Sequence, residues 1–326
     1  EASSGGVEIV ILNFSEVEAM DSYGLGLLIA LLARAQRQKQ HLVACGPSAP
    51  LRTAFAATYL DEAFPVYDDE VSALAGPMEA PVAQELEDSG AGPQRQWARP
   101  VQRLSVPALP KEAISLNVQG RRPMGPMKGF GPLWLRTYQI GLTGSAATPA
   151  QVIRVWKEQF AGFWPPGSTF YGADRPIELG DVGVLNLAGP AGTTIATGIF
   201  VAYADDESFC FLSVEGHMFG GMITFSAYEE DGVTVAQVQA MLRSGDPVYE
   251  LGQRLGFAVE AEDQFWQGTL TNLAAHFGAE GETVDQDAVL LDPTIQWARA
   301  TNLWYNAAMR TTLYLPIRWA RGLFAR

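Results

Sequence analysis

The first 74 residues alternate short apolar runs with segments of helical periodicity. A continuous run of β-branched and aliphatic residues at 7–14 predicts a strand that is covered on both faces. Leucines and an isoleucine between Leu25 and Leu32 recur at helical spacing, which predicts a helix over 24–38. A second strand is expected at 41–45, a second helix at 51–60 and a last edge strand at 64–67. The order predicts a small α/β unit with a mixed sheet.

A second, longer unit begins near residue 130. Residues 133–140 alternate Trp, Tyr and aliphatic positions, as a strand does. Thr148 and Pro149 then open a helix whose buried face includes Trp156. Further strands are expected at 182–187, 194–203, 208–214, 218–229 and 234–242, followed by helices at about 247–255 and 261–277. This order predicts an α+β unit in which a curved antiparallel sheet surrounds a long final helix.

Composition changes between the two units. Residues 75–110 are rich in Pro, Ala, Gly, Gln and Glu and cannot bury enough apolar surface to fold alone, so they indicate a linker. Residues 119–131 place Arg121, Arg122 and Lys128 between glycines and prolines, which is typical of an arm laid over the next unit or of a solvated loop. The predicted boundaries are 1–74 for the first unit, 75–129 for the linker and basic arm, 130–279 for the second unit and 280–326 for a helical tail.

The turn between the first strand and the first helix carries the most informative motif, Asp21-Ser22-Tyr23-Gly24. A hydroxyl at Ser22 can cap free N–H groups at the helix start, and an added phosphate would meet the positive end of the helix dipole. Gly24 leaves that approach sterically open. The alternative is that Ser22 serves only as an N-cap, a role that serine commonly has at helix starts.

Together with the elements that follow and the turn Gly46-Pro47-Ser48, this motif resembles the STAS domain of bacterial anti-sigma factor antagonists. The resemblance covers residues 7–74 and implies that Ser22 is phosphorylated by a partner kinase, which switches partner binding. Tyr23 departs from the family, where a second serine is common, and the usual opening strands and an acidic residue near the phosphosite are absent. The chain begins at Glu1, so we expect a fragment or processed product whose sheet edge something else covers.

The second unit resembles the START and polyketide-cyclase-like superfamily, or SRPBCC, which has a helix-grip fold. The resemblance covers about 129–278, and its most specific part is a closing helix with Trp266, Leu270 and Leu273. It implies that an apolar small molecule or lipid lies between sheet and helix. The alternative is that large side chains fill that space. The candidate ligand-lining residues are Phe200, Phe211, His217, Met218, Met222, Phe225, Tyr228 and Trp266.

The tail from residue 292 onward reverses the charge of the chain. Five arginines and no acidic residue follow Pro293, and Pro316 is expected to divide the segment into two helices. Arg and Trp on amphipathic helices suit the headgroup level of an anionic membrane. They equally suit packing on an acidic protein surface, which we prefer because the rest of the chain is acidic. The candidate docking residues are Trp297, Arg299, Trp304, Arg310, Arg318, Trp319 and Arg321.

Overall composition narrows the function classes. The formal net charge of −14 and the isoelectric point near 4.7 argue against nucleic acid as a partner. Cys45 and Cys210 lie inside apolar strand patterns, which is typical of buried cysteines in a reducing compartment. The sequence shows no signal-peptide pattern and no membrane-spanning run, which favours a cytoplasmic protein, with the membrane periphery as the alternative.

Catalytic motifs are scarce. His41, His217 and His276 are dispersed, so no metal site is expected, and no phosphate-binding or dinucleotide-binding loop indicates a cofactor. His217, with Glu215 on the same turn, is a weak candidate for acid–base catalysis; the alternative is a hydrogen-bonded structural histidine.

Three functions are compatible with these patterns. The first is a non-enzymatic signalling or assembly protein, in which a STAS module exchanges partners such as a kinase or an anti-sigma-type regulator and a helix-grip module holds an apolar ligand. The second is a cyclase-like or hydratase-like enzyme that uses His217 and carries the STAS module for regulation. The third is an accessory subunit that docks on a larger or membrane-bound complex through residues 292–326. The first is the leading hypothesis.

Overall fold

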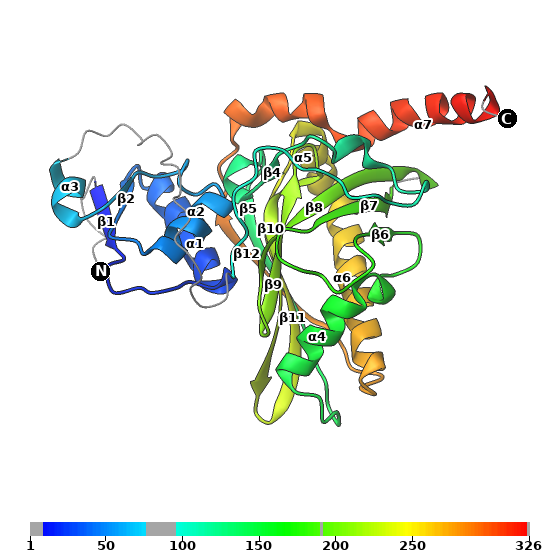
Figure 1. The fold of residues 1–326 in the computed structure, drawn as a ribbon, viewed down its shortest axis with the longest axis horizontal. Coiled ribbons are helices and arrows are strands. Elements are labelled where there is room, and N and C mark those ends of the chain that lie inside the picture. The colour runs from blue at the N-terminus through cyan, green and yellow to red at the C-terminus, as the bar shows by residue number, and fades with distance from the viewer. Residues whose placement is uncertain (1–8, 76–95, 190–191, 325–326) are drawn as a thin grey trace.

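Two sheets organise the protein (Figure 1). The structure is a computed structural model that describes residues 9–75, 96–189 and 192–324, with side chains described as far as residue 316. A three-stranded parallel sheet lies near the N-terminus, and a nine-stranded antiparallel sheet makes up the rest. Both predicted fold classes are confirmed, and the strands of the first sheet that the structure describes are parallel where a mixed sheet was expected.

The first unit follows the order that its periodicity predicts. Its strands β1 (Ile9–Asn13), β2 (His41–Cys45) and β3 (Val66–Tyr67) pair in parallel in that order. Its helices are α1 (Ser22–Arg37), α2 (Ala49–Ala57) and α3 (Glu70–Ala75). Parallel neighbours need a crossover connection, which is why a helix separates each pair of strands.

The second unit has a helix-grip arrangement. Its strands are β5 (Leu133–Gly141), β6 (Thr169–Tyr171), β7 (Val182–Ala188), β8 (Thr194–Ala204), β9 (Ser208–Val214), β10 (Phe219–Glu230) and β11 (Val233–Ser244). The spatial order of the main sheet is β12-β5-β11-β10-β9-β8-β7-β6. The helices are α4 (Pro149–Glu158), the 3-10 turn η3 (Phe160–Phe163), α5 (Pro247–Arg254) and the long α6 (Phe257–His276).

Local capping explains where these helices begin. Thr148 and Gln151 form a reciprocal capping box at α4, as the Thr-Pro start predicts. Helix α6 begins at Phe257, four residues before the predicted start. Gly256 adopts φ +86° between α5 and α6, so the two helices are separated by a glycine in the left-handed region.

The linker contains short elements that its composition does not predict, and the tail adds a strand before its expected helices. In the linker, η1 (Ser115–Asn117), β4 (Pro123–Met124) and η2 (Pro126–Lys128) lie along the second unit, and β4 pairs with β9. Residues 76–95 of the predicted linker lie outside the described residues. In the tail, β12 (Asp285–Asp292) adds an edge strand beside β5, followed by η5 (Trp297–Tyr305) and α7 (Ala307–Phe324).

The predicted helix break at Pro316 is wrong. Proline 316 lies inside α7, and the change of direction occurs at Asn306, between η5 and α7. The side-chain oxygen of Asn306 accepts a hydrogen bond from the N–H of Met309 at 2.9 Å. An asparagine cap at this point starts a new helix, which explains the position of the boundary.

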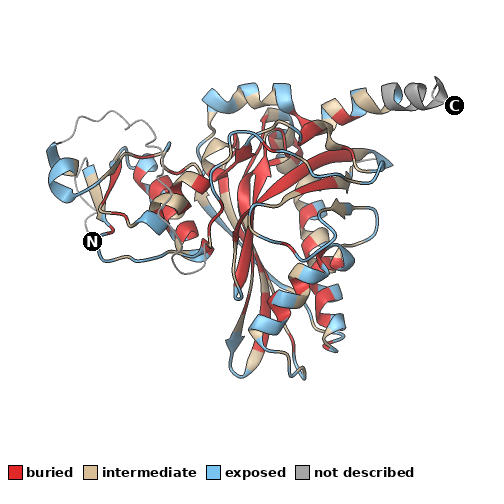
Figure 2. Ribbon diagram, in the orientation of Figure 1, coloured by how far each residue is buried: buried red, intermediate tan, exposed pale blue. Residues whose placement is uncertain are grey.

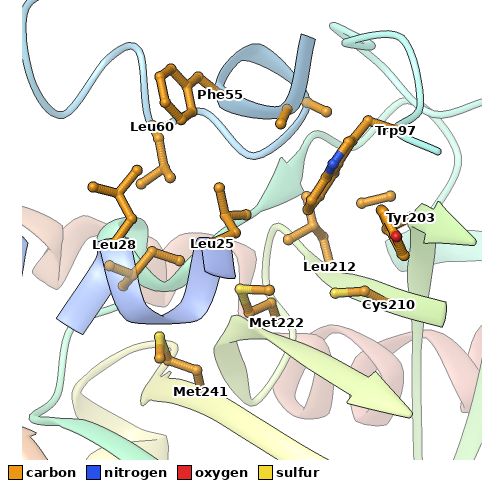
Figure 3. Packing of buried hydrophobic residues seen from close by; sticks show 14 of the residues in the cluster. Leu25, Leu28, Phe55, Leu60, Trp97, Tyr203, Cys210, Leu212, Met222 and Met241 are labelled. Atoms are coloured by element: carbon orange, nitrogen blue, oxygen red, sulfur yellow. The ribbon is translucent and has the colours of Figure 1, made fainter. Parts of the chain in front are cut away.

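The large sheet is covered on both faces. We call the face that carries α6 the helix face and the opposite side the outer face. On the helix face, Phe225 and Val238 pack with Trp266 of α6. On the outer face, Met222 and Met241 belong to one buried cluster with α1 of the first unit (Figure 3), and buried positions continue from one unit into the other (Figure 2). The two units therefore share a hydrophobic core.

Gly26 of α1 offers a test of this shared core. A side-chain carbon at Gly26 would lie 3.5 Å from Cε of Met241, which is an ordinary contact. Gly26→Ala should therefore fit and raise the free energy of unfolding by up to about 1 kcal/mol, because alanine favours helix. Gly26→Phe should clash with Met241 and lower the free energy of unfolding by about 1–3 kcal/mol. Urea unfolding followed by circular dichroism measures both, and equal stability of the two variants would contradict this packing.

Candidate functional site

The Asp21–Ser22 turn lies where the two units meet. Asp21 is the N-cap of α1, and its side chain accepts a hydrogen bond from the N–H of Gly24 at 2.7 Å. Ser22 is the first helical residue, and only 2% of its surface is exposed. The capping role considered for Ser22 therefore belongs to Asp21, whose carboxylate meets the first free N–H groups of the helix. Ser22 is left without that role and is buried.

Trp97 of the linker lies between this turn and strand β8 of the second unit. Nε1 of Trp97 donates a hydrogen bond to the carbonyl oxygen of Met20 at 2.7 Å. The Trp97 ring lies 4.8 Å from the Tyr203 ring of β8, measured between centroids. Burial, and next a hydrogen bond to Asp205, raise the pKa of Tyr203, and the charge of Asp21 adds to that shift. Tyr203 is thus a neutral phenol close to the turn.

The basic arm makes a second set of contacts between the units. Nζ of Lys128 lies 3.0 Å from the carboxylate of Glu62 and 4.0 Å from the centroid of the Tyr59 ring. A side-chain carbon at Gly125 would lie 2.9 Å from the carbonyl oxygen of Thr58, so glycine permits the close backbone approach. This part of the arm is packed between the units and is not a solvated loop.

The candidate ligand-lining residues fall on both faces of the large sheet. Phe211, Phe225 and Trp266 lie in the core of the helix face. Phe200 and Met222 lie in the core of the outer face, which is shared with α1. The remaining three are spread out: Tyr228 accepts a hydrogen bond from Gln139, Met218 packs beside Phe219, and His217 is buried next to a small cavity. The structure therefore does not bring all eight together.

Aromatic rings fill much of the space between the sheet and α6. The Phe160 ring lies 5.2 Å from that of Phe211 and 5.3 Å from that of Phe225, and Phe225 lies 5.6 Å from Trp266. Edge-on contacts of this kind are favourable and dense. The arrangement corresponds to the alternative in which large side chains occupy the grip interior. Binding of an apolar ligand there stays a prediction.

His217 borders a cavity of about 20 Å³ near the turn between β9 and β10. That volume suits about one water molecule. Nδ1 of His217 accepts a hydrogen bond from the N–H of Phe219 at 3.0 Å, and burial lowers the pKa of His217 to about 4. The imidazole is therefore neutral and carries its proton on Nε2. Glu215, the neighbouring carboxylate, lies 3.4 Å from Arg121 and forms an ion pair with it.

Sequence reasoning missed a second buried polar group, Glu262 of α6. Its carboxylate lies 3.7 Å from Nε of Arg136 on β5, and both of its oxygens lack a hydrogen-bond partner among the described residues. Burial, opposed by Arg136 and reinforced by Asp263, raises the pKa of Glu262 to about 7. The signal was present: Glu262 precedes Trp266 by four residues, so both side chains lie on the same helix face.

The docking candidates of the tail differ in exposure. Trp297 and Trp304 are 73% and 79% exposed, and Arg299 is also exposed. Arg310 donates from Nε to Oδ1 of Asn117 at 2.9 Å, which ties α7 to the linker. Arg318, Trp319 and Arg321 lie in the part of α7 whose side chains are outside the described residues.

A family model described as "STAS domain" matches residues 1–73. The first unit is a STAS domain. Among curated proteins, no sequence matches this chain. The order of elements and the Asp21-Ser22 turn thus predicted the family of the N-terminal part correctly. The match covers less than a quarter of the chain, so the second unit must be described from its own structure.

Solved structures similar to the second unit share few residues with it. Ginseng major latex-like protein 151 from Panax ginseng is 13% identical over 45% of this chain and 99% of that chain, with a TM-score of 0.32. The di-domain ARO/CYC StfQ from the steffimycin biosynthetic pathway is 11% identical over 45% of this chain and 50% of that chain, with a TM-score of 0.34. The KanY protein is 12% identical over 44% of this chain and 95% of that chain, with a TM-score of 0.35. At such scores, the helix-grip description rests on the strand order and on α6.

Metal sites and membrane-spanning helices can be assessed for the described residues. No group of three His, Cys, Asp or Glu side chains within them is placed to hold a metal ion. None of the helices described there combines the length and the apolar character that crossing a bilayer requires. Cys45 of the STAS domain and Cys210 of the second unit, which we call the grip domain from here on, are both buried free thiols.

The buried His217 should make the protein sensitive to acid. Its pKa of about 4 lies below the ordinary value of 6.5, so the unfolded chain binds its proton first as pH falls. The free energy of unfolding should then fall by roughly 2–3 kcal/mol between pH 6.5 and 4 because of this group. His217→Gln should remove that part of the pH dependence, and the exposed His41→Gln should not. Urea unfolding at pH 7 and 4.5 gives the change in the free energy of unfolding between the two pH values. An equal change in both variants would contradict the burial of His217.

Glu262 should have the opposite pH dependence. Its pKa of about 7 lies above the ordinary value of 4.5, so its favourable contribution is present below pH 4.5 and is lost as pH rises through 7. Glu262→Gln mimics the protonated form and should gain about 1–3 kcal/mol relative to the wild type at pH 8, with little gain at pH 5. Glu260→Gln, on the exposed side of α6, is the control and should show no such difference. A gain that does not depend on pH would argue against a titrating Glu262.

Proposed function

We propose that this protein is a non-enzymatic signalling or assembly protein in which the grip domain holds the STAS domain in a closed state. In that state, α1 of the STAS domain and the Asp21–Ser22 turn are covered by the outer face of the sheet and by Trp97. Phosphorylation of Ser22 favours an open state in which α1 becomes available to a protein partner. The observation that carries the proposal is the burial of Ser22 in a turn whose neighbours contact the rest of the chain, Met20 through Trp97 and Gly26 through Met241.

The physical basis is the cost of placing charge in this contact. A phosphate adds a charge of about −1.5 to −2 and three strong hydrogen-bond acceptors. At Ser22 it would lie next to the carboxylate of Asp21, in a turn bounded by the Met20 carbonyl that Trp97 contacts and by the apolar residues of α1. Burying an unpaired charge costs several kcal/mol, whereas separating the domains lets water solvate the phosphate. The positive end of the α1 dipole offsets only a part of this cost.

The contacts between the domains are suited to a reversible closure. Besides the apolar cluster they include a solvent-accessible ion pair, Lys128 with Glu62, and a cation–π contact between Lys128 and Tyr59. Exposed ion pairs contribute little to stability, so most of the closing free energy comes from apolar burial around α1. A partner that offers a comparable apolar surface could therefore compete with the sheet for α1.

The grip domain has the role of a docking platform in this proposal. Its aromatic interior supports a packed scaffold more than an open binding site. The enzymatic alternative has weaker support, because His217 is neutral, accepts a backbone hydrogen bond and has no carboxylate partner in Glu215. Regulation of the STAS domain thus explains more of the geometry than catalysis does.

Ser22→Glu should open the closed state. Hydrogen exchange of α1 amides over residues 25–32 should accelerate by at least about tenfold, because the buried carboxylate is unfavourable when the domains are in contact. Ser22→Ala should leave exchange close to that of the wild type. Ser15→Glu adds the same charge at an exposed position of the STAS domain and serves as the control. Hydrogen-exchange mass spectrometry gives the rates for all four proteins.

Two results would contradict the proposal. Equal exchange in Ser22→Glu and Ser22→Ala would mean that charge at Ser22 does not open the contact. Equal acceleration in Ser22→Glu and Ser15→Glu would mean that the effect reflects general loss of stability. Far-ultraviolet circular dichroism should show that each variant keeps its secondary structure, since opening leaves each domain folded.

A further inference from the structure

Exposed apolar side chains gather on three neighbouring helices at one end of the grip domain. The helices α5, η5 and the first turns of α7 are joined by side chains: Asn306 donates to Oδ2 of Asp246 at 2.8 Å, and the N–H of Ala308 donates to the Tyr249 hydroxyl at 3.0 Å. We call their exposed apolar side chains the end surface. Its members are Val248, Leu251, Leu255, Trp304, Met309 and Leu313.

These side chains are held firmly although they are exposed. Gly216, at φ +89° in the turn between β9 and β10, lies against the tail so closely that a side-chain carbon would come within 2.0 Å of the Tyr305 carbonyl oxygen. The N–H of Ala307 donates to the Gly216 carbonyl at 2.9 Å. Thr311 and Asn117 are buried and hydrogen-bonded to each other at 3.1 Å. The tail is therefore a fixed part of the grip domain, and its outward residues form a defined surface.

The charge of this region is opposite to that of the rest of the chain. All 36 acidic residues lie before Pro293, so η5 and α7 have none. The single acidic residue of α5, Glu250, is buried and accepts hydrogen bonds from Ser244 and Arg254. Arg254 of α5, which pairs with Glu250, and Arg299 of η5 are exposed on the helices that carry these apolar residues. Apolar and cationic groups are thus combined on one surface.

We propose that the end surface binds the headgroup region of an anionic lipid bilayer. Leu251, Leu255 and Trp304 project outward from helices, which suits insertion among lipid headgroups better than enclosure of a partner's side chain. Arginine keeps its guanidinium at the headgroup level while its stem covers apolar surface. The acidic remainder does not prevent this contact, because charges more than about 10 Å away are largely screened at physiological salt. This proposal is independent of the Ser22 switch.

Flotation with lipid vesicles tests the proposal with the full-length protein. Wild type should float with vesicles that contain about one third phosphatidylglycerol and should not float with phosphatidylcholine alone. Arg299→Glu should weaken binding roughly ten- to thirtyfold, since it reverses one charge at the lipid surface. Trp304→Ala should weaken it roughly tenfold through lost apolar burial. Arg37→Glu, an equal reversal at an exposed position of α1, should change binding by less than about twofold.

Other outcomes overturn the proposal. Absence of binding to anionic vesicles, or equal binding of the wild type, Arg299→Glu and Trp304→Ala, would exclude a lipid site at the end surface. Equal flotation with neutral and anionic vesicles would exclude a role for the arginines. A dimer in light scattering that Trp304→Ala converts to a monomer, without vesicle binding, would assign the surface to a second copy of this chain. Binding only to an acidic polypeptide such as polyglutamate would assign it to an acidic protein partner.

Discussion

The apolar contact between α1 and the outer face of the large sheet is the interaction on which the arrangement depends. A sheet that faces water on one side alternates apolar and polar residues, but β9 has Cys210, Leu212 and Val214 on its outer side and is buried throughout. Such a face needs a cover. The STAS helix α1, the linker around Trp97 and the start of α7 provide it, each over a different part of the sheet. The extra elements of this chain therefore complete the grip domain's core.

Sequence periodicity predicted the elements whose residues carry local signals. The STAS order, the capped helix α4, six strands of the second unit and the long α6 were all expected near their observed positions. β12 was not, because Asp285–Asp292 is exposed along most of its length and its pairing with β5 depends on residues far away in the sequence. The linker was predicted from its composition alone, and composition could not show that Trp97 and Lys128 pack between the domains. Long-range contacts decide these features.

The candidate ligand-lining residues lie on both faces of the sheet, and strand parity explains this distribution. The prediction of ligand-lining residues rests on side-chain size and apolar character, which do not distinguish the two faces of a strand. Phe225 and Met222 of β10 are three positions apart, so they point to opposite faces, one toward α6 and one toward α1. The same parity could have shown that both faces of β10 are apolar and that two covers are needed. The Asp21-Ser22 turn was recognised from its motif, but its contact with Trp97 through the Met20 carbonyl could not be read from local sequence.

The turn and the tail contact different parts of the sheet, and this separation has a consequence for how the protein can move. The tail is fixed by Asn306 with Asp246 and by Asn117 with Thr311, and none of these residues belongs to the STAS domain. The opening proposed for the contact at α1 would therefore leave the tail contacts intact. Polar groups paired in a buried setting are costly to separate, whereas an apolar face can exchange one cover for another. In the proposed mechanism, the chain thus combines a surface held in a fixed orientation with a domain that is released from the same sheet.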